Sequence, residues 1–266
     1  MKNVVITGST RGIGYGLARE FLKRNCRVII TGRKQEQVDT VVGELGGVFE
    51  AANVAGTNSD VTSPKSLQSL WNFAVKTFGA VDVWVNNAGI SIARKPLHET
   101  SDDELKNIVD TNLTGMLYAN RVVLAGMHAQ GRGQVWNMEG FGSGGQTAPG
   151  MAAYGATKRA VNYLNKALQK EVKGSEVQVC TLSPGIVVTD LLTGDYDLAS
   201  EEWKKARKIL NILGDTVETV TPFLVDGILK SDKSGAKVVW LTGGKAFVRF
   251  LTAGFKKRDL FAHIPG

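Results

Sequence analysis

Short runs of β-branched apolar residues alternate with longer amphipathic stretches along this chain, and the alternation restricts the fold more than any other feature. Runs of strand length followed by apolar residues at helical spacing are typical of strand–helix–strand units. The predicted strands are 3–7, 27–31, 54–60, 81–85, 134–138, 176–182 and 237–241. The predicted helices are 13–24, 34–45, 64–78, 101–130, 152–173 and 201–213. This order predicts an α/β fold, a doubly wound, Rossmann-like parallel sheet of seven strands with helices on both faces, in one domain over residues 1–266.

Composition narrows the class of protein further. With 43% hydrophobic and 21% charged residues, the chain has the balance of an ordinary globular protein. Its cysteines, Cys26 and Cys180, lie beside or inside apolar runs and fit core positions in a reducing compartment. No apolar stretch approaches the roughly 18 residues of a membrane span, and the first strand follows Met1 almost at once. We therefore expect a cytoplasmic protein, although a trimmed chain would look the same.

A glycine-rich turn, Thr-Gly-Ser-Thr-Arg-Gly-Ile-Gly over 7–14, joins the first predicted strand to the first predicted helix. Glycines in such a turn let the backbone approach a pyrophosphate, whose charge then faces the helix N-terminus. Glycine-rich turns are common, but this position after a strand and before an apolar helix favours dinucleotide binding. The predicted contacts in the turn are Gly8, Ser9, Thr10, Arg11, Gly12, Ile13 and Gly14.

The end of the second strand indicates which dinucleotide binds. An NAD site usually has an acid there for the ribose hydroxyl, whereas an arginine accommodates a 2′-phosphate. Here the strand is followed by Gly32 and Arg33, and Arg11 lies in the neighbouring turn. Either arginine alone is more often a surface residue. Both together predict NADPH, because guanidinium groups match phosphate geometry.

Tyr154 and Lys158 are four residues apart on a predicted helix and therefore share one face. A nearby ammonium favours the phenolate, so we predict a lowered pKa for Tyr154 and a role as proton donor to a carbonyl. Asn112 falls on the apolar face of another predicted helix, where a buried amide needs a partner. Asn112 either makes a structural hydrogen bond or takes part in a proton relay to Lys158, and we favour the relay.

These motifs together resemble the short-chain dehydrogenase/reductase family over about residues 3–190. The resemblance implies that Asp60 and Val61 contact adenine, and that Asn87, Ala88 and Gly89 line the cofactor. It also implies that Lys158 bonds the nicotinamide ribose beside Tyr154. The turn after the sixth strand would pack beside the nicotinamide through Pro184, Gly185 and Val187, with Thr189 on its carboxamide. Residues 191–215 would form the substrate lid.

One position departs from that family. Its usual serine, which bonds the substrate carbonyl, is replaced by Gly140 or Phe141, depending on the alignment. Ser143 is the nearest hydroxyl and our candidate for the catalytic role, with Glu139 as another group near the carbonyl. The surrounding segment 136–145, Trp-Asn-Met-Glu-Gly-Phe-Gly-Ser-Gly-Gly, resembles the loop of the chlorophyll b reductases of plants, the non-yellow-coloring type. That resemblance implies NADPH-dependent reduction of the C7 formyl group of chlorophyll b or chlorophyllide b.

The C-terminal segment 245–266 gives weaker indications about partners. Phe247, Phe250, Leu251 and Phe255 lie at helical spacing, and the basic cluster 256–258 follows them. This pattern fits core or a subunit interface, and it also fits peripheral contact with a membrane surface. The formal net charge of +7 comes without a nucleic-acid recognition motif, so we expect no nucleic-acid partner.

The sequence also bears on metal binding, assembly and substrate. The three histidines have no ligand spacing, so we predict no metal site. The resemblance implies a homo-oligomer, a large apolar tetrapyrrole as substrate and, for a plant enzyme, a plastid location. The alternatives are a generic reductase of ketones, aldehydes or 3-oxoacyl groups, and a non-catalytic NADPH-binding scaffold.

Overall fold

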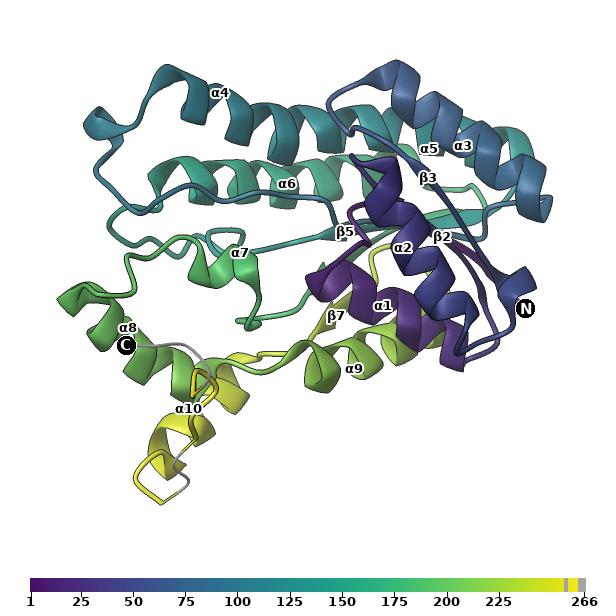
Figure 1. Ribbon diagram of the computed structural model, residues 1–266. Coiled ribbons are helices and arrows are strands. Elements are labelled where there is room, and N and C mark those ends of the chain that lie inside the picture. The colour runs from purple at the N-terminus through teal and green to yellow at the C-terminus, as the bar shows by residue number, and fades with distance from the viewer. Residues whose placement is uncertain (256–257, 263–266) are drawn as a thin grey trace.

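The computed structural model describes residues 1–255 and 258–262 and contains a seven-stranded sheet in which every pairing is parallel (Figure 1). The strands are β1 (Asn3–Ile6), β2 (Arg27–Gly32), β3 (Val54–Asn58), β4 (Val83–Asn86), β5 (Gly133–Met138), β6 (Val177–Ser183) and β7 (Lys237–Val239). They lie in the order β3-β2-β1-β4-β5-β6-β7. The chain order reverses between β1 and β4, which is where such sheets form a ligand crevice.

Helices cover both faces of the sheet, as the sequence predicts. They are α1 (Gly12–Lys23), α2 (Gln35–Gly46), α3 (Pro64–Phe78), α4 (Asp102–Val109), α5 (Gly115–Gln130), α6 (Ala152–Glu171), α7 (Asp190–Thr193), α8 (Glu201–Leu213), α9 (Val217–Lys230) and α10 (Gly243–Thr252). One core cluster joins the sheet to α1, α2 and α9, and the other joins it to α3, α5 and α6. The two groups lie below and above the sheet in Figure 1.

Two helical regions differ from the sequence prediction. The stretch 101–130 is not one helix, because a π-helical turn over Asp110–Thr114 separates α4 from α5. Helix α9 was not predicted at all, since Pro222 lies inside it and ordinarily interrupts a helix. Its face nevertheless buries Val220, Leu224 and Val225 against the sheet.

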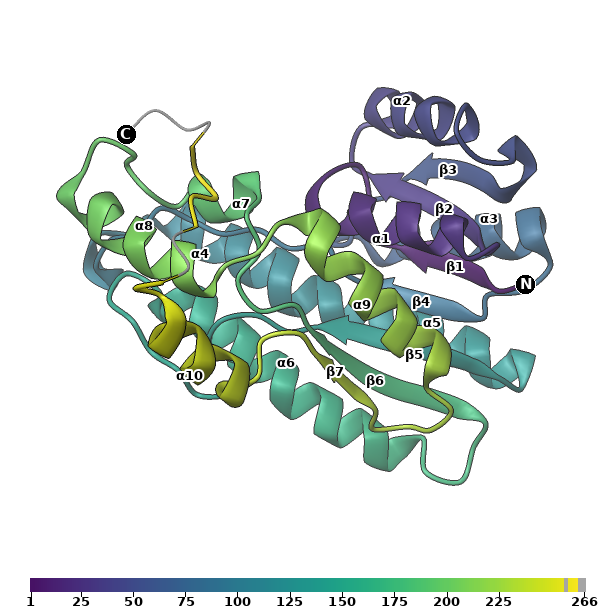
Figure 2. The same ribbon diagram turned by 90° about the horizontal axis from the view of Figure 1, so that it is seen from below.

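A third, smaller cluster lies beyond the carboxyl ends of the strands. Trp203 of α8 packs edge-on against Phe261 with ring centroids 5.1 Å apart, and Tyr196 contacts Trp203 at 5.2 Å. The same region contains α7, α8 and α10, which lie together on the left of Figure 1 and Figure 2. Within residues 1–255 and 258–262, no helix is both long and apolar enough to span a bilayer.

Candidate active site

The glycine turn has the backbone geometry that a bound pyrophosphate needs. Gly8 and Gly12 have φ of +63° and +56°, which side-chain-bearing residues rarely adopt. A Cβ on Gly14 would lie 2.3 Å from the Gly8 carbonyl oxygen, so the helix approaches the turn as closely as it can. Ser9 holds the turn to the sheet, because its N–H donates to the Thr31 carbonyl at 2.8 Å. The amino end of α1 therefore faces a cradle for an anion.

The far side of this cradle is basic. Gly32 leaves room that the Thr10 side chain occupies, since a Cβ there would lie 2.8 Å from Thr10 Cγ2. Arg33 is exposed at the end of β2, and no acid takes the position. Arg11 is also exposed and pairs with Asp190 of α7 at 3.5 Å. These residues fit the 2′-phosphate of NADP(H) and give no ribose-binding carboxylate.

The segment after β4 is tied to the glycine turn by the amide of Asn87. Its Nδ2 donates to the carbonyls of Thr7 and Gly8 at 2.9 and 3.0 Å. Thr7 Oγ1 accepts from the N–H groups of Asn87 and Ala88, both at 3.0 Å. Thr7 is thus a supporting residue that the sequence analysis missed. These bonds hold together the carboxyl ends of the paired parallel strands β1 and β4.

Asp60 and Val61 follow the carboxyl end of β3, the strand at one edge of the sheet. Asp60 is exposed, and its carboxylate accepts from the backbone N–H and hydroxyl of Thr62 at 2.9 and 2.8 Å. Val61 packs beside Gly115, where a Cβ would come within 3.0 Å of Val61 Cγ2. Both residues lie at the sheet edge where the family resemblance implies that adenine binds.

Tyr154 and Lys158 lie on the first turns of α6 and face the end of β5. Lys158 is buried, and its Nζ lies 5.6 Å from the centre of the Tyr154 ring. A Cβ on Gly140 would lie 2.6 Å from Tyr154 Oη and 3.1 Å from Lys158 Cε. Gly140 therefore lets Tyr154 and Lys158 approach the strand end, and any side chain there would displace the phenol.

Burial controls the protonation of this pair. It raises the pKa of Tyr154, an effect to which the negative charge of Asp195 adds and which Arg94 opposes. Burial also lowers the pKa of Lys158 to about 8, against the charge of Glu139. The predicted lowering of the Tyr154 pKa is therefore wrong for this chain, because desolvation of the buried phenol has the largest effect on it. A raised pKa favours the phenol form, which can act as an acid.

Asn112 occupies the π-helical turn between α4 and α5. Its Oδ1 accepts from the Ile90 N–H and its Nδ2 donates to the Ile90 carbonyl, both at 2.8 Å. A Cβ on Gly89 would lie 3.3 Å from Asn112 Oδ1 and 3.8 Å from Lys158 Nζ. The extra residue of the π turn thus aims the amide at the loop after β4. The structural hydrogen bond is confirmed, while the relay to Lys158 stays a prediction.

The loop after β5 brings the Ser143 hydroxyl back to the strand end. Ser143 Oγ accepts from the Gly140 N–H at 3.1 Å, and the residue is buried. No acceptor for its own hydroxyl proton occurs in the described part of the chain. Glu139 does not serve the carbonyl, because its carboxylate pairs with Lys237 at 2.8 Å and accepts from Asn162 at 2.9 Å.

The turn after β6 closes the site from the other side. Pro184 and Val187 are buried, and Gly185 has a φ of +74°. Thr189 faces the glycine turn, since a Cβ on Gly12 would lie 3.5 Å from Thr189 Cγ2. The expected lid follows as α7, an irregular segment and α8. The contacts of these residues with the nicotinamide stay a prediction.

A polar cluster near Tyr154 was not predicted. Ser91 Oγ donates to Asp195 Oδ2 at 2.7 Å, and the Arg94 N–H donates to the Asp195 carbonyl at 3.1 Å. The Arg94 guanidinium stacks on the Tyr196 ring at 4.3 Å. Burial raises the pKa of Asp195 to about 6. The cluster joins the loop after β4 to the expected lid segment, and sequence spacing carries no signal for such contacts between distant loops.

Three other expectations concern residues outside this centre. The segment 245–266 includes α10 from its third residue onward, but Lys256, Lys257 and His263 lie outside the described residues. Among the residues that are described, no group of three or more histidine, cysteine or acidic side chains is placed to hold a metal ion. Cys26 and Cys180 are both buried and free, as the sequence predicts.

Residues 2–197 match the model of the short chain dehydrogenase family, and the chain belongs to that family of oxidoreductases. It is similar to the chloroplastic chlorophyll(ide) b reductase NOL of Arabidopsis thaliana, with 40% identity over 94% of this chain and 73% of that protein. It is also 38% identical to the probable chlorophyll(ide) b reductase NYC1 of Oryza sativa, over 98% of this chain and 54% of that protein. Among solved structures, ElxO with NADP bound is 30% identical, with a TM-score of 0.78 over 92% of this chain and 98% of that one.

Proposed function

We propose that the chain is an NADPH-dependent reductase of the C7 formyl group of chlorophyll b or chlorophyllide b. The observation that carries the proposal is the protonated, buried phenol of Tyr154 beside the side-chain-free Gly140. It is supported by the similarity to reductases of that name over nearly the whole chain. The product is the 7-hydroxymethyl pigment.

The protein's own groups have separable tasks in this reaction. NADPH bound at the glycine turn would supply the hydride to the carbonyl carbon. Tyr154 donates its proton to the carbonyl oxygen, which gains negative charge as the carbon is reduced. Lys158, whose pKa lies at about 8, is close enough to working pH to return a proton through the Asn112 turn. Arg11 and Arg33 hold the 2′-phosphate.

Ser143 takes the place of the missing serine in this proposal. The Gly140 N–H donates to the Ser143 hydroxyl oxygen. Gly140 also lies next to the Tyr154 hydroxyl, since a Cβ on Gly140 would be 2.6 Å from Tyr154 Oη. The hydroxyl proton of Ser143 is therefore available to the substrate carbonyl. Two donors on one oxygen would orient the formyl group and stabilise its developing charge.

The glycines of the same loop have different roles. A Cβ on Gly142 would lie 2.6 Å from Gly155 Cα, so this glycine allows the loop to pack on α6. Gly144 and Gly145 lie farther out, and Gly145 has a φ of +95°. The four glycines of this loop lack side chains that would narrow the approach of a flat macrocycle to Tyr154, and the exposed Phe141 offers an apolar surface for its ring.

The expected homo-oligomer is part of the proposal. Its support is the exposure of Leu117, a large apolar side chain on the surface helix α5. Light scattering on the purified protein measures the oligomeric state directly. A plastid or cytoplasmic location follows from the source of the chain and is tested by localising a tagged copy.

The decisive experiment mixes the purified protein with NADPH and chlorophyllide b and follows the pigment spectrum. Appearance of the 7-hydroxymethyl product, lost in Tyr154→Phe, is the expected result. Tyr163→Phe is the matched control, since this tyrosine lies on the same helix but is 76% exposed. Consumption of NADPH with small aldehydes or ketones but no pigment would overturn the substrate assignment and leave a generic reductase. NADPH binding without any turnover would leave a scaffold.

A further inference from the structure

Helix α10 presents large apolar side chains to solvent. None of its residues is buried, which is unusual for a helix with this many aromatic and aliphatic groups. Phe247 and Leu251 are both 64% exposed, and Phe255, just after the helix, is 91% exposed. Val248 and Phe250 are more than half exposed as well. An apolar face of this kind marks a contact surface rather than core.

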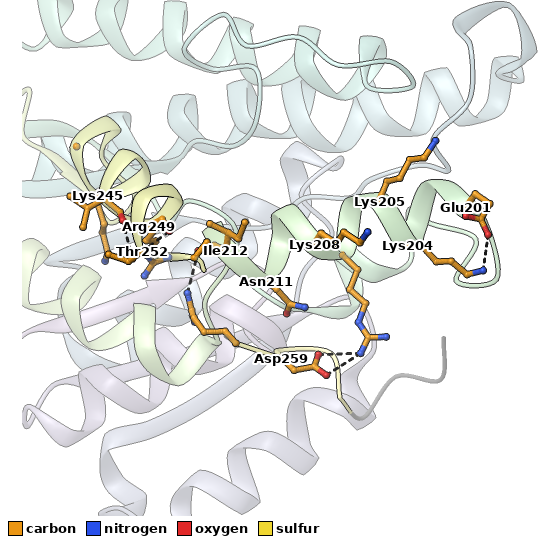
Figure 3. Close-up of a pocket in the computed structure, with 15 residues that line it drawn as sticks. Glu201, Lys204, Lys205, Lys208, Asn211, Ile212, Lys245, Arg249, Thr252 and Asp259 are labelled. Carbon is orange, nitrogen blue, oxygen red and sulfur yellow. Dashed lines mark hydrogen bonds and ion pairs between the residues drawn. The ribbon is translucent and has the colours of Figure 1, made fainter. Parts of the chain in front are cut away.

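A basic groove runs beside this helix. The space between α8 and α10 has a volume of about 1390 Å³, and Figure 3 shows the side chains that line it. Seven of them are basic, namely Lys204, Lys205, Arg207, Lys208, Lys245, Arg249 and Arg258. Only Glu201 and Asp259 oppose them, and no residue of the active site lines the groove. The groove exceeds the usual size of a small-ligand pocket and is open, as a docking surface is.

The basic side chains divide into those that hold the structure and those that do not. Arg249 and Arg258 both pair with the buried carboxylate of Asp215, at 2.8 and 2.7 Å. Arg207 pairs with Asp259, and Lys204 with Glu201. Lys205 and Lys208 are exposed, and neither has an acidic partner within residues 1–255 and 258–262. These two ammonium groups are available to an external anion.

We propose that α8 and α10 together form a docking surface for a bilayer that carries anionic phospholipid. The apolar side chains of α10 enter the interface between headgroups and acyl chains, while Lys205 and Lys208 contact lipid phosphate. Exposed aromatic and aliphatic groups beside basic ones are the features that hold an amphipathic helix in that plane. The inference uses no property of the catalytic centre, so it stands or falls separately from the reductase activity.

Charge and position favour a bilayer over other occupants. A second copy docked symmetrically on this face would set its lysines against the same lysines, which is unfavourable. The surface also lies at the same end of the sheet as α7 and the lid, as Figure 1 and Figure 2 show. A bilayer bound there faces the side on which the substrate site opens.

The test is flotation of the purified full chain with vesicles. One set consists of phosphatidylcholine alone, and the other contains about one third phosphatidylglycerol. We expect binding to the anionic vesicles only, weakened by added salt. Inorganic phosphate is a competitor and is compared with sodium chloride at equal ionic strength: greater displacement of the protein by phosphate than by chloride would show that a free anion, not a lipid surface, occupies the groove.

Two variants separate the two halves of the surface. Lys205→Glu/Lys208→Glu should weaken binding at least about 30-fold, since each lysine near an anionic surface contributes about fivefold. Phe247→Ser/Leu251→Ser should weaken it to a similar extent, because it removes the inserted groups. The matched control is Lys65→Glu/Lys76→Glu, an equal charge change at exposed positions on α3. Melting temperature and circular dichroism establish that each variant is folded.

Three results would overturn the proposal. The first is failure of the unaltered chain to float with anionic vesicles. The second is an equal loss of binding in the α3 control, which would make attraction depend on net charge alone. The third is unchanged binding in Phe247→Ser/Leu251→Ser, which would exclude insertion of α10 and leave electrostatic adsorption alone.

Discussion

The nucleotide end of the sheet and the lid end are stabilised in different ways. Around β1 and β2 the site is made of backbone: glycines, N–H groups and strand ends set its shape, and the functional side chains are few. Around α7, α8 and α10 the shape depends on side chains from distant segments, such as Trp203 on Phe261 and Asp215 with two arginines. Adding a single methyl group to a glycine should therefore disrupt the nucleotide end, whereas the stability of the lid end should depend on the charge and protonation of its side chains.

The largest effect is expected from Gly14→Ala. Its Cβ would lie 2.3 Å from the Gly8 carbonyl oxygen, so the turn must move. We expect the dissociation constant for NADPH to rise about a thousandfold and stability to fall by roughly 3 kcal/mol. Gly43→Ala is the control, because Gly43 lies within α2 with open space around it and should gain up to about 1 kcal/mol. Fluorescence titration and thermal unfolding measure both, and equal behaviour of the two variants would contradict the backbone interpretation.

Ser143→Ala tests the loop that joins the two ends. Loss of a donor to the developing oxyanion should lower kcat by about 100-fold or more while NADPH binding is retained. Ser143→Thr keeps a hydroxyl and should recover part of the rate. Steady-state kinetics with the pigment substrate are the measurement. A kcat within twofold of the unaltered enzyme would remove Ser143 from the catalytic groups.

Arg33→Glu should reverse the cofactor preference without affecting the lid. An acid at the end of β2 repels the 2′-phosphate and can bond a ribose hydroxyl instead. We expect kcat/KM with NADPH to fall by about 30-fold and that with NADH to rise. Arg132→Glu, at the opposite end of the sheet, controls for net charge. An unchanged preference for NADPH over NADH would mean that Arg11 alone binds the 2′-phosphate.

The smallest effect concerns protonation in the lid. Burial raises the pKa of Asp195 to about 6 from 3.8, so the folded state holds this proton more tightly than the unfolded chain does. Its contribution to stability is present below about pH 4 and is lost as the pH rises through 6. Asp195→Asn should therefore flatten the pH dependence of unfolding in that window by about 1–2 kcal/mol. Denaturant titrations at several pH values measure this, and parallel curves for both proteins would contradict it.

Most of the sheet and its nucleotide site could be predicted from the sequence because they depend on local patterns. The strand predicted at 54–60, for example, is β3 at Val54–Asn58, and the turn after β1 has the expected conformation. Helix α9 could not be found, because its burial outweighs the local cost of Pro222. The π turn at Asn112 was equally hidden, since one extra residue leaves the apolar periodicity nearly intact.

The lid cluster was missed for a different reason. Ser91, Arg94 and Asp195 come from loops that have no periodicity, and only the folded chain brings them together. The prediction of a lowered Tyr154 pKa was wrong because the four-residue spacing shows which groups are neighbours but not how far they are desolvated. In this site the loss of water around the phenol decides its protonation.

The carboxylate of Asp215 is held by Arg249, Arg258 and the Trp240 indole N–H, and it belongs to the segment that pairs with Val187. The apolar helix α10 is thus tied through Arg249 to the turn after β6. A protein attached to a bilayer through this helix would keep the end of the sheet that carries Tyr154 in one orientation relative to the lipid. It would meet a pigment dissolved in that lipid by diffusion within a plane, and the search would become two-dimensional.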